Sequence, residues 1–252
     1  MVVDNLPIEL KSVTLDYGGD DVVRNVDLTV GDGETKVILG PSGVGKSTIL
    51  KAILGLLRAK TGQIFVHGKE ISKLSEPELV QIRLGMAIVF QNGALFDSMT
   101  VGENVSYRLR EHGLMKDLLI PERVQEVLHF VGLEGAFKLK PAQLSGGMKK
   151  RVAIARALAP DPAIFLFDEP TVGLDPINAF NIERLILKLK QRKVTIVIVT
   201  HDVGSAFRLA DSIAMLHEGR FIFEGTPEEL RKNTDKRVQA FLDPSTGIKE
   251  EL

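Results

Sequence analysis

Hydrophobic residues along the chain follow two alternating patterns, one typical of strands and one typical of helices. Short continuous apolar runs, which fit buried strands, occupy residues 37–39, 86–90, 163–167 and 194–199. Between these runs apolar residues return every three or four positions, most clearly in 176–191, where they form one face of a helix. Strands that alternate with helices predict an α/β fold with a mainly parallel sheet covered on both faces.

The first thirty residues predict an antiparallel hairpin instead. Residues 8–17 alternate between apolar and polar with one slip, and residues 22–30 follow after a glycine-rich turn. Tyr17 closes the first of these strands, and this stretch alone favours a half-buried strand aromatic. Further strands are predicted at 62–67, 212–216 and 220–224, and further helices at 76–84 and 203–210.

Helical periods dominate from residue 92 to residue 160. The predicted helices there cover 101–110, 121–131 and 146–159, and glycines and prolines separate them. We therefore interpret 92–160 as a helical subdomain inserted into a single domain that spans 1–252. A capping-box pattern at Thr226 predicts one more helix, and 235–252 is interpreted as a C-terminal tail whose first part adds a turn or two of helix.

Composition narrows the class of protein. Hydrophobic residues make up 44% and charged residues 26%, values typical of a soluble globular protein. The 32 basic and 33 acidic residues nearly cancel, so the charge does not favour nucleic acid as a partner. The sequence has no cysteine, which excludes disulfides and thiolate metal sites and suits a reducing compartment. It shows neither a signal-peptide pattern nor an apolar run near the ~20 residues that span a bilayer, so we expect another chain to supply any membrane part.

The most informative stretch is a glycine-rich turn, Gly40-Pro41-Ser42-Gly43-Val44-Gly45-Lys46-Ser47-Thr48. It fits the pattern G-x-x-x-x-G-K-[ST], with a strand before it and a helix after it as that pattern requires. Glycines allow several backbone N–H groups to point into one concavity, and a helix N-terminus adds positive charge at the same place. The stretch predicts a loop that binds a polyphosphate.

A metal site is predicted where the buried strand 163–167 runs into Asp168 and Glu169. Ligands of open α/β sheets bind at the carboxyl ends of the strands. Asp168 would hold Mg²⁺, directly or through water, with Ser47 as a second oxygen ligand, and Glu169 would polarise an attacking water as general base. Two adjacent acids after a strand fit a solvated turn equally well, but the nearby phosphate loop favours the metal site.

These motifs and several others occur in the order and spacing of the nucleotide-binding domain of ABC transporters, which the chain resembles over nearly its whole length. They are Tyr17, the phosphate loop 40–48, Gln91, the tetrad Leu144-Ser145-Gly146-Gly147, Asp168-Glu169, Gly173-Leu174-Asp175 and His201. The tetrad is the most specific of them, since other phosphate-loop ATPases lack it. The resemblance implies an ATPase that uses ATP and Mg²⁺ and has the phosphate-loop NTPase (RecA-like) fold, with an N-terminal antiparallel β subdomain and an inserted helical subdomain.

The resemblance also implies roles for single residues. Tyr17 would stack on adenine, Lys46 would neutralise the β- and γ-phosphates, Gln91 would sense Mg²⁺ and the attacking water, and His201 would hydrogen-bond the γ-phosphate. Ser145, Gly146 and Gly147 would act on the ATP held by a second copy of the chain, and Asp175 would lie at the seam. ATP would thus join two copies into a homodimer, and hydrolysis would release them.

Other residues near these motifs have plainer interpretations. Lys149-Lys150-Arg151 is interpreted as the solvated face of the helix that starts at the tetrad, with attraction of the partner's nucleotide as the weaker alternative. Four histidines show no metal-ligand spacing and are assigned to surface or packing: His67, His112, His129 and His217. Met148 stands where the family usually has Gln, which puts a ribose-side contact in doubt but not the use of ATP.

Several stretches are more similar to one branch of the family, the ATPase subunits of Mla-type lipid transporters. They are residues 90–101, the tetrad with Met148, residues 173–177 and residues 238–242. That branch works with MCE-domain proteins and moves phospholipids between bacterial membranes, which implies a permease and an MCE-domain protein as partners. The chain would then be peripheral, on the cytoplasmic face of the inner membrane. Leu95 and Phe96 are candidates for the surface that meets the permease, and the alternative is that they are core of the helical insert.

Two other functions stay open on the sequence. One is the ATPase subunit of an importer of amino acids or another small solute; the other is a soluble ABC ATPase, such as one in iron–sulfur assembly. Both would share every ATP motif and differ in their partners. A DNA-repair or chromosome ATPase is disfavoured by the absence of coiled-coil heptads and of a basic excess.

Overall fold

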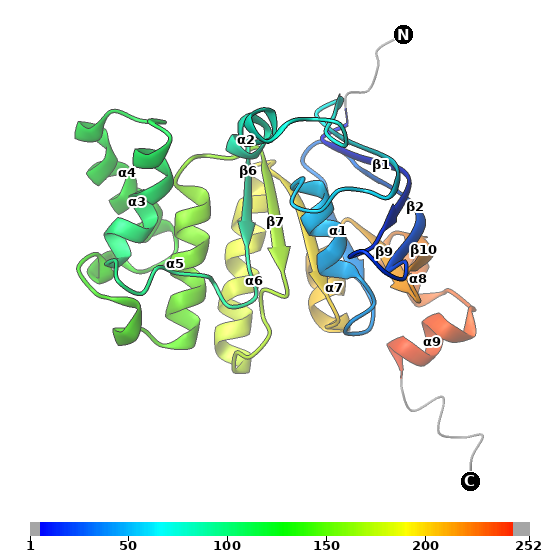
Figure 1. The fold of residues 1–252 in the computed structure, drawn as a ribbon. Helices are drawn as coiled ribbons and strands as arrows, with labels where there is room; N and C mark the ends of the chain where they lie inside the picture. Colours follow the sequence, from blue (N-terminus) through cyan, green and yellow to red (C-terminus); the bar gives the residue numbers. More distant parts are fainter. Residues whose placement is uncertain (1–5, 244–252) are drawn as a thin grey trace. The chain divides into compact units, whose positions relative to one another are not determined.

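The computed structural model describes residues 6–243, and Figure 1 draws its helices and strands as a ribbon. The chain divides into two compact units. Unit 1 contains the residues up to Ile82 and those from Lys193 onward, and unit 2 is Arg83–Arg192. The predicted helical insert, 92–160, lies within unit 2. Unit 2 also contains the strands β6 (Met86–Val89) and β7 (Ile164–Asp168), which flank that insert in sequence.

The first sheet of unit 1 is antiparallel, as the hairpin pattern predicts. β1 (Ile8–Leu15) pairs with β2 (Val23–Val30) and with β4 (Thr61–Val66), and β5 (Lys69–Glu70) extends the edge beyond β4. The slip in the alternation of β1 corresponds to a shift of register between Leu10 and Val13. Such a bulge moves the following side chains back to the buried face of the sheet.

The second sheet of unit 1 is mainly parallel. β3 (Thr35–Leu39) pairs in parallel with β8 (Thr195–Thr200) and with β9 (Ser212–His217), while β10 (Arg220–Gly225) pairs antiparallel with β9. Every residue of β3 and β8 is buried. The helices of this unit are α1 (Lys46–Ile53), α7 (Val203–Leu209), α8 (Pro227–Arg231) and α9 (Lys236–Leu242). Helix α2 (Glu76–Leu84) belongs to it as far as Ile82, and its last two residues, Arg83 and Leu84, are the first of unit 2.

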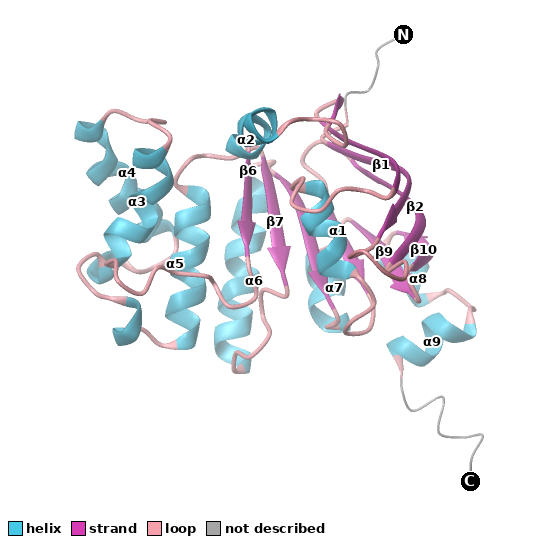
Figure 2. Cartoon of the chain, in the orientation of Figure 1, coloured by secondary structure: helices cyan, strands magenta, loops and turns pink. Residues whose placement is uncertain are grey.

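Unit 2 combines a parallel strand pair with helices. β6 pairs in parallel with β7. The helices α3 (Val101–Glu111), α4 (Ile120–Phe130) and α5 (Gly146–Leu158) pack against one another, and α6 (Pro176–Gln191) packs against α5 (Figure 2). Short 3-10 helices lie in the connections, at Asp117–Leu119, Glu134–Ala136 and Pro141–Gln143.

The predicted elements agree with the observed ones to within one or two residues at their ends. The predicted capping box is present, because Thr226 accepts from the backbone N–H of Glu229 while the Glu229 carboxylate accepts from Thr226. Of the predicted tail, 236–242 is the helix α9, with Val238 buried, and 244–252 lies outside the described residues. The sequence pattern missed β5 and the 3-10 helices, since elements of two or three residues are too short to show a period.

We predict that Gly62→Ala destabilises the chain. Gly62 has φ of 86°, and a Cβ there would lie 2.4 Å from the carbonyl oxygen of Ser12 and 2.5 Å from that of Lys11. We expect the free energy of unfolding in urea to fall by about 2 kcal/mol or more. Gly135→Ala is the matched control, because nothing lies within 4 Å of its Cβ position, and it should change stability by less than ~0.5 kcal/mol. Equal stabilities of the two variants would contradict the prediction.

Candidate functional site

The phosphate loop of unit 1 lies between β3 and α1, and its conformation requires glycine. Gly40, Gly43 and Gly45 have φ of 157°, 80° and 109°, values that side-chain-bearing residues rarely adopt. A Cβ at Gly40 would come within 2.3 Å of the Leu216 carbonyl oxygen, and one at Gly45 within 2.9 Å of Val23 Cγ2. Both backbone angle and lack of space therefore fix glycine at the two ends of the loop.

The N-terminus of α1 offers N–H groups to an anion. Its N-cap residue is Gly45, so no side chain caps the helix, and the first N–H groups of a helix have no partner within it. Lys46 folds back over the loop, where its Nζ donates to the carbonyl oxygens of Gly40 at 2.9 Å and Pro41 at 2.8 Å. The loop thus gathers N–H donors and a cation, an arrangement that fits a polyphosphate.

Tyr17 lies beside this loop, and the prediction of a half-buried strand aromatic is wrong. β1 ends at Leu15, and the side chain of Tyr17 is 59% exposed. The Tyr17 hydroxyl is 3.3 Å from Oγ1 of Thr48, and Nζ of Lys51 is 5.5 Å from the centre of the ring. An exposed ring tethered to α1 presents a face on which a base can stack.

His201 leaves the sheet at the same edge as the phosphate loop. β3 and β8 are parallel neighbours, with Leu39 opposite Thr200, so Gly40 and His201 follow at equal register. The next residue, Asp202, caps α7 by accepting from the N–H groups of Gly204 and Ser205. The structure therefore places His201 next to the start of the loop, at the edge predicted for it.

The edge of β6 and β7 in unit 2 brings together Gln91, Asp168 and Glu169. Val89 lies opposite Phe167 in this parallel pair, so Asp168, the last residue of β7, and Gln91 and Glu169, which come just after the two strands, share one edge. Glu169 is buried and has φ of 47°, in the left-handed region that is uncommon for a residue with a side chain. Strained backbone of this kind gathers at functional sites.

Lys150 contacts this edge, which corrects the prediction of a solvated Lys149–Arg151 face. Its side chain is 6% exposed, and its Nζ donates to the carbonyl oxygen of Glu169 at 3.3 Å. Burial lowers the pKa of the Lys150 ammonium, and the negative charges of Asp168 and Glu169 oppose that shift. The sequence held a signal for this burial, since Lys150 lies on the same helix face as the buried Gly147 and Ile154.

The tetrad forms the start of α5. Ser145 is the N-cap, and its Oγ accepts from the backbone N–H of Met148 at 3.2 Å. Gly147 is buried, and a Cβ there would lie 2.3 Å from Oδ1 of Asn178, a residue of α6. The tetrad therefore packs against the start of α6, a contact that sequence reasoning did not find.

Asp175 caps α6 and is bound by the same Asn178. Its carboxylate accepts from the backbone N–H of Asn178 at 3.0 Å and from the Asn178 side-chain amide at 2.6 Å. These two hydrogen bonds hold the pKa of the Asp175 carboxyl below its usual value. The structure thus connects the tetrad to Asp175 through one amide side chain.

The donor chemistry of the predicted metal ligands suits Mg²⁺. Ser47, Gln91 and Asp168 each offer oxygen, the ligand atom that this ion prefers, and magnesium is commonly bound by one or two carboxylates together with substrate phosphates. Among residues 6–243, no three His, Cys, Asp or Glu side chains gather into a group that could hold a metal.

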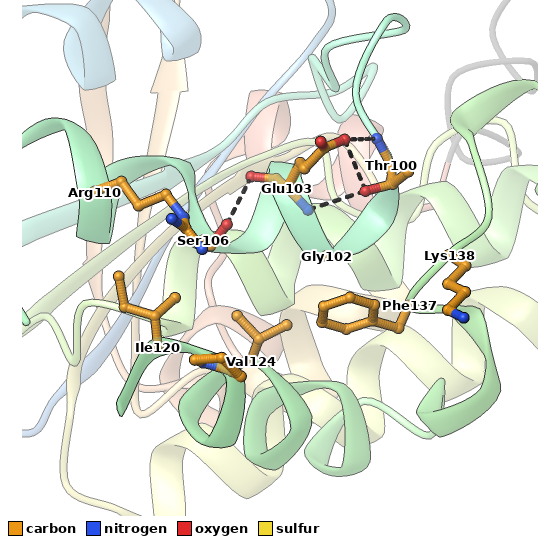
Figure 3. A pocket seen from close by; sticks show the side chains of 10 residues that line it. Thr100, Gly102, Glu103, Ser106, Arg110, Ile120, Val124, Phe137 and Lys138 are labelled. Atoms are coloured by element: carbon orange, nitrogen blue, oxygen red, sulfur yellow. Dashed lines mark hydrogen bonds between the residues drawn. The ribbon is translucent and has the colours of Figure 1, made fainter. Parts of the chain in front are cut away.

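A separate cavity of about 280 Å³ lies in unit 2 between α3 and α4 and contains none of the predicted site residues (Figure 3). Three of its polar residues hydrogen-bond to one another: the Glu103 carboxylate accepts from Thr100, and the Ser106 hydroxyl donates to the Glu103 carbonyl oxygen. The ring of Phe137 closes over Gly102, where a Cβ would meet it at 2.7 Å. We assign this cavity no part in nucleotide chemistry.

Comparison with known proteins decides the family. Residues 23–172 match the ABC transporter family. The chain belongs to that family. It is an ATP-binding and ATP-hydrolysing ABC subunit, as the tetrad and the phosphate loop predicted. None of the described helices is long and apolar enough to cross a membrane.

Two curated relatives are similar to the chain over most of its length. The "Intermembrane phospholipid transport system ATP-binding protein MlaF" of Haemophilus influenzae is 41% identical over 236 residues, which are 93% of this chain and 89% of that protein. The "Probable ribonucleotide transport ATP-binding protein mkl" of Mycobacterium leprae is 41% identical over 237 residues, 94% of this chain and 68% of that protein.

Solved structures confirm the ABC cassette fold. The ATP-binding cassette MJ0796, a dimer in a post-hydrolysis state bound to ADP and Pi, has a TM-score of 0.81 at 36% identity and covers 87% of this chain and 98% of its own. CbiO1 of Clostridium perfringens, part of the ABC transporter complex cbiONQ, has a TM-score of 0.83 at 30% identity and covers 98% and 100%.

We predict that Tyr17→Ala weakens ATP binding without lowering stability, because the ring is exposed and its face is where a base would stack. The loss of one stacking contact should raise the Kd for ATP about 10-fold, or roughly 1.4 kcal/mol. Calorimetric titration with ATP and thermal unfolding would measure the two effects. Tyr17→Phe is the control, since it keeps the ring and removes only the hydroxyl. Wild-type affinity in Tyr17→Ala would contradict a role in base binding.

Proposed function

We propose that this chain energises phospholipid transport between bacterial membranes by hydrolysing ATP for a separate membrane permease. The observation that carries the proposal is the 41% identity over 93% of the chain to a protein named for that transport. In this proposal the ATP chemistry rests on the glycine loop before α1 and on Asp168 and Glu169 at the carboxyl end of β7.

In the proposed cycle the residues of unit 1 bind and orient the nucleotide. The N–H groups of loop 40–45 and the Lys46 ammonium bind the phosphates, Tyr17 stacks on the adenine, and His201 contacts the γ-phosphate. Mg²⁺, when bound through Ser47, Asp168 and Gln91, would neutralise charge on the phosphates. Glu169 would accept a proton from the attacking water, and Gln91 would help to position that water.

A second copy would complete each site. Ser145 and Gly146 are exposed at the N-terminus of α5, and helix N-termini bind phosphate. We propose that they contact ATP held by the partner copy and that Asp175 lies at the dimer seam. Two ATP molecules would then hold the dimer together, and hydrolysis would release it.

We predict that Glu169→Gln traps the dimer. Glutamine keeps the shape of the side chain but does not accept the proton of the attacking water, so kcat should fall by roughly 100-fold or more. ATP should still bind, and size-exclusion chromatography with ATP and Mg²⁺ should show a stable dimer. Lys46→Ala is the contrasting variant and should bind ATP poorly and stay monomeric. A wild-type rate in Glu169→Gln would refute the general-base role.

The surface proposed to meet the permease lies just past Gln91. The ring of Phe96 is 40% exposed and packs on Tyr107 of α3 at 4.7 Å between ring centres. Phe96 is thus not core of the helical insert. Tyr107, which its ring contacts, lines a cavity of about 420 Å³ together with Met99 and polar residues of α3, and a short permease helix could enter that cavity.

A buried asparagine fixes this segment. Asn104 is fully buried; its Nδ2 donates to the carbonyl oxygens of Phe96 and Met99, and its Oδ1 accepts from the N–H of Phe96 at 2.8 Å. The backbone of Phe96 is therefore held from both sides. A rigid loop of this kind can pass a displacement to the permease without absorbing it.

We predict that Phe96→Ala weakens binding to the permease and leaves the ATPase rate of the isolated chain within about 2-fold of wild type, because the ring lies outside the nucleotide residues. Binding to the reconstituted permease complex and the ATPase rate with and without that complex would measure this. Leu118→Ala is the matched control, since Leu118 is 90% exposed in the same unit. Equal permease binding by both variants would refute the proposed surface.

Copurification tests the substrate and the partners. The chain, tagged in its native cell, should copurify from gently solubilised membranes with a polytopic permease, an MCE-domain protein and phospholipid, from the cytoplasmic face of the inner membrane. A solute-binding protein with another permease would instead favour an importer of amino acids, nucleotides or another small solute. Soluble partners alone would favour a soluble ABC ATPase. Either result would leave the ATPase assignment standing and refute lipid transport.

A further inference from the structure

We propose that Lys150 is a positioning residue that holds the backbone of Glu169 in its left-handed conformation. Helix α5 would thereby link the tetrad at its N-terminus to the general base of its own chain. The inference rests on the proposed role of Glu169 and adds to it a residue that the ATP motifs do not include.

The left-handed backbone conformation of Glu169 must be stabilised by the contacts around it. A residue with a side chain is disfavoured at φ of 47°, so contacts around it must select that conformation. The Glu169 carbonyl oxygen accepts from Nζ of Lys150 at 3.3 Å and from the backbone N–H of Val172 at 3.4 Å. Two donors on one carbonyl oxygen fix the orientation of the peptide group that follows Glu169. The orientation of that group determines the direction in which the Glu169 side chain leaves the backbone.

A lysine at this place has a cost that packing alone does not explain. Lys150 is almost fully buried, and burial disfavours its charged form. An apolar residue of the same length would fill the space without that cost. Such a residue would lack the hydrogen bond to Glu169 and the positive charge near Asp168 and Glu169. We therefore attribute the presence of lysine here to these two properties.

The position of Lys150 in α5 links Glu169 to the tetrad, which is proposed to contact the nucleotide of the partner copy. Ser145 caps the helix, and Lys150 lies five residues further along the same rigid element. A helix moves as one body over so short a distance. A displacement of the tetrad on meeting the partner's nucleotide would therefore move Nζ of Lys150 against the backbone of Glu169.

The test compares Lys150→Met and Lys150→Arg in the full-length chain. Methionine keeps the packing but donates no hydrogen bond, so we expect kcat for ATP to fall roughly 10- to 100-fold with KM within about 2-fold. Because ATP binding survives, Lys150→Met should also accumulate an ATP-bound dimer, as Glu169→Gln is expected to do. Lys150→Arg retains a donor of similar reach and should recover most of the rate. Lys188→Met, an exposed lysine of α6, is the control and should behave as wild type.

The outcomes separate this inference from the proposed function. If Glu169→Gln hydrolyses ATP at the wild-type rate, the general-base role fails and the inference fails with it. If Glu169→Gln is inactive but Lys150→Met keeps the wild-type kcat, only the inference is overturned. It is overturned as well if Lys150→Met loses thermal stability and ATP affinity together with its rate, because that pattern indicates packing and not positioning.

Discussion

The uncapped N-terminus of α1 is the constraint on which the nucleotide chemistry depends. The helices α3, α7 and α8 begin at side chains that accept from their first N–H groups, namely Thr100, Asp202 and Thr226. Such a cap stabilises a helix by about 1 kcal/mol. Gly45 has no side chain that could form such a cap at α1. The close contacts of Gly40 and Gly45 with neighbouring residues then keep the loop in the one conformation that directs its N–H groups inward.

Parallel strand pairing positions the other residues that are predicted to act on the nucleotide. One such pair of strands does this in each unit. In unit 1 the pairing of Leu39 with Thr200 brings the loop and His201 to one edge. In unit 2 the pairing of Val89 with Phe167 does the same for Gln91 and the two acids. In both cases the side chains predicted to act on the nucleotide stand at the carboxyl end of a buried strand or just after it. Register therefore determines which residues share a site, because a shift by one residue would turn the following side chain to the other face.

The sequence predicted the elements and the motifs well, because both depend on short-range patterns. Burial of single polar residues depends on distant contacts and was harder to predict. Lys150 looked like part of a solvated charge run, yet it contacts Glu169, nineteen residues away in sequence. Tyr17 looked like a strand residue, yet β1 ends before it, and its ring is tethered to Thr48. The burial of Asn104 could not be predicted from the pattern of apolar residues in α3. Its side chain is buried and hydrogen-bonds to the backbone of Phe96 and Met99.

The two helix N-termini proposed to bind phosphate are built differently, and the difference suits a dimer that opens and closes. At α5 the Ser145 hydroxyl accepts from the N–H of Met148, so the helix is capped within its own chain. The same hydroxyl keeps its proton, which it can donate to a phosphate oxygen on the partner copy without breaking the cap. Separation of the copies would thus leave the Met148 N–H with its partner, and buried donors without partners are costly. At α1, where the nucleotide belongs to the chain itself, no such self-cap is present. Glycine at one N-cap and serine at the other would therefore suit the two proposed roles, binding within one chain at α1 and separable contact between two copies at α5.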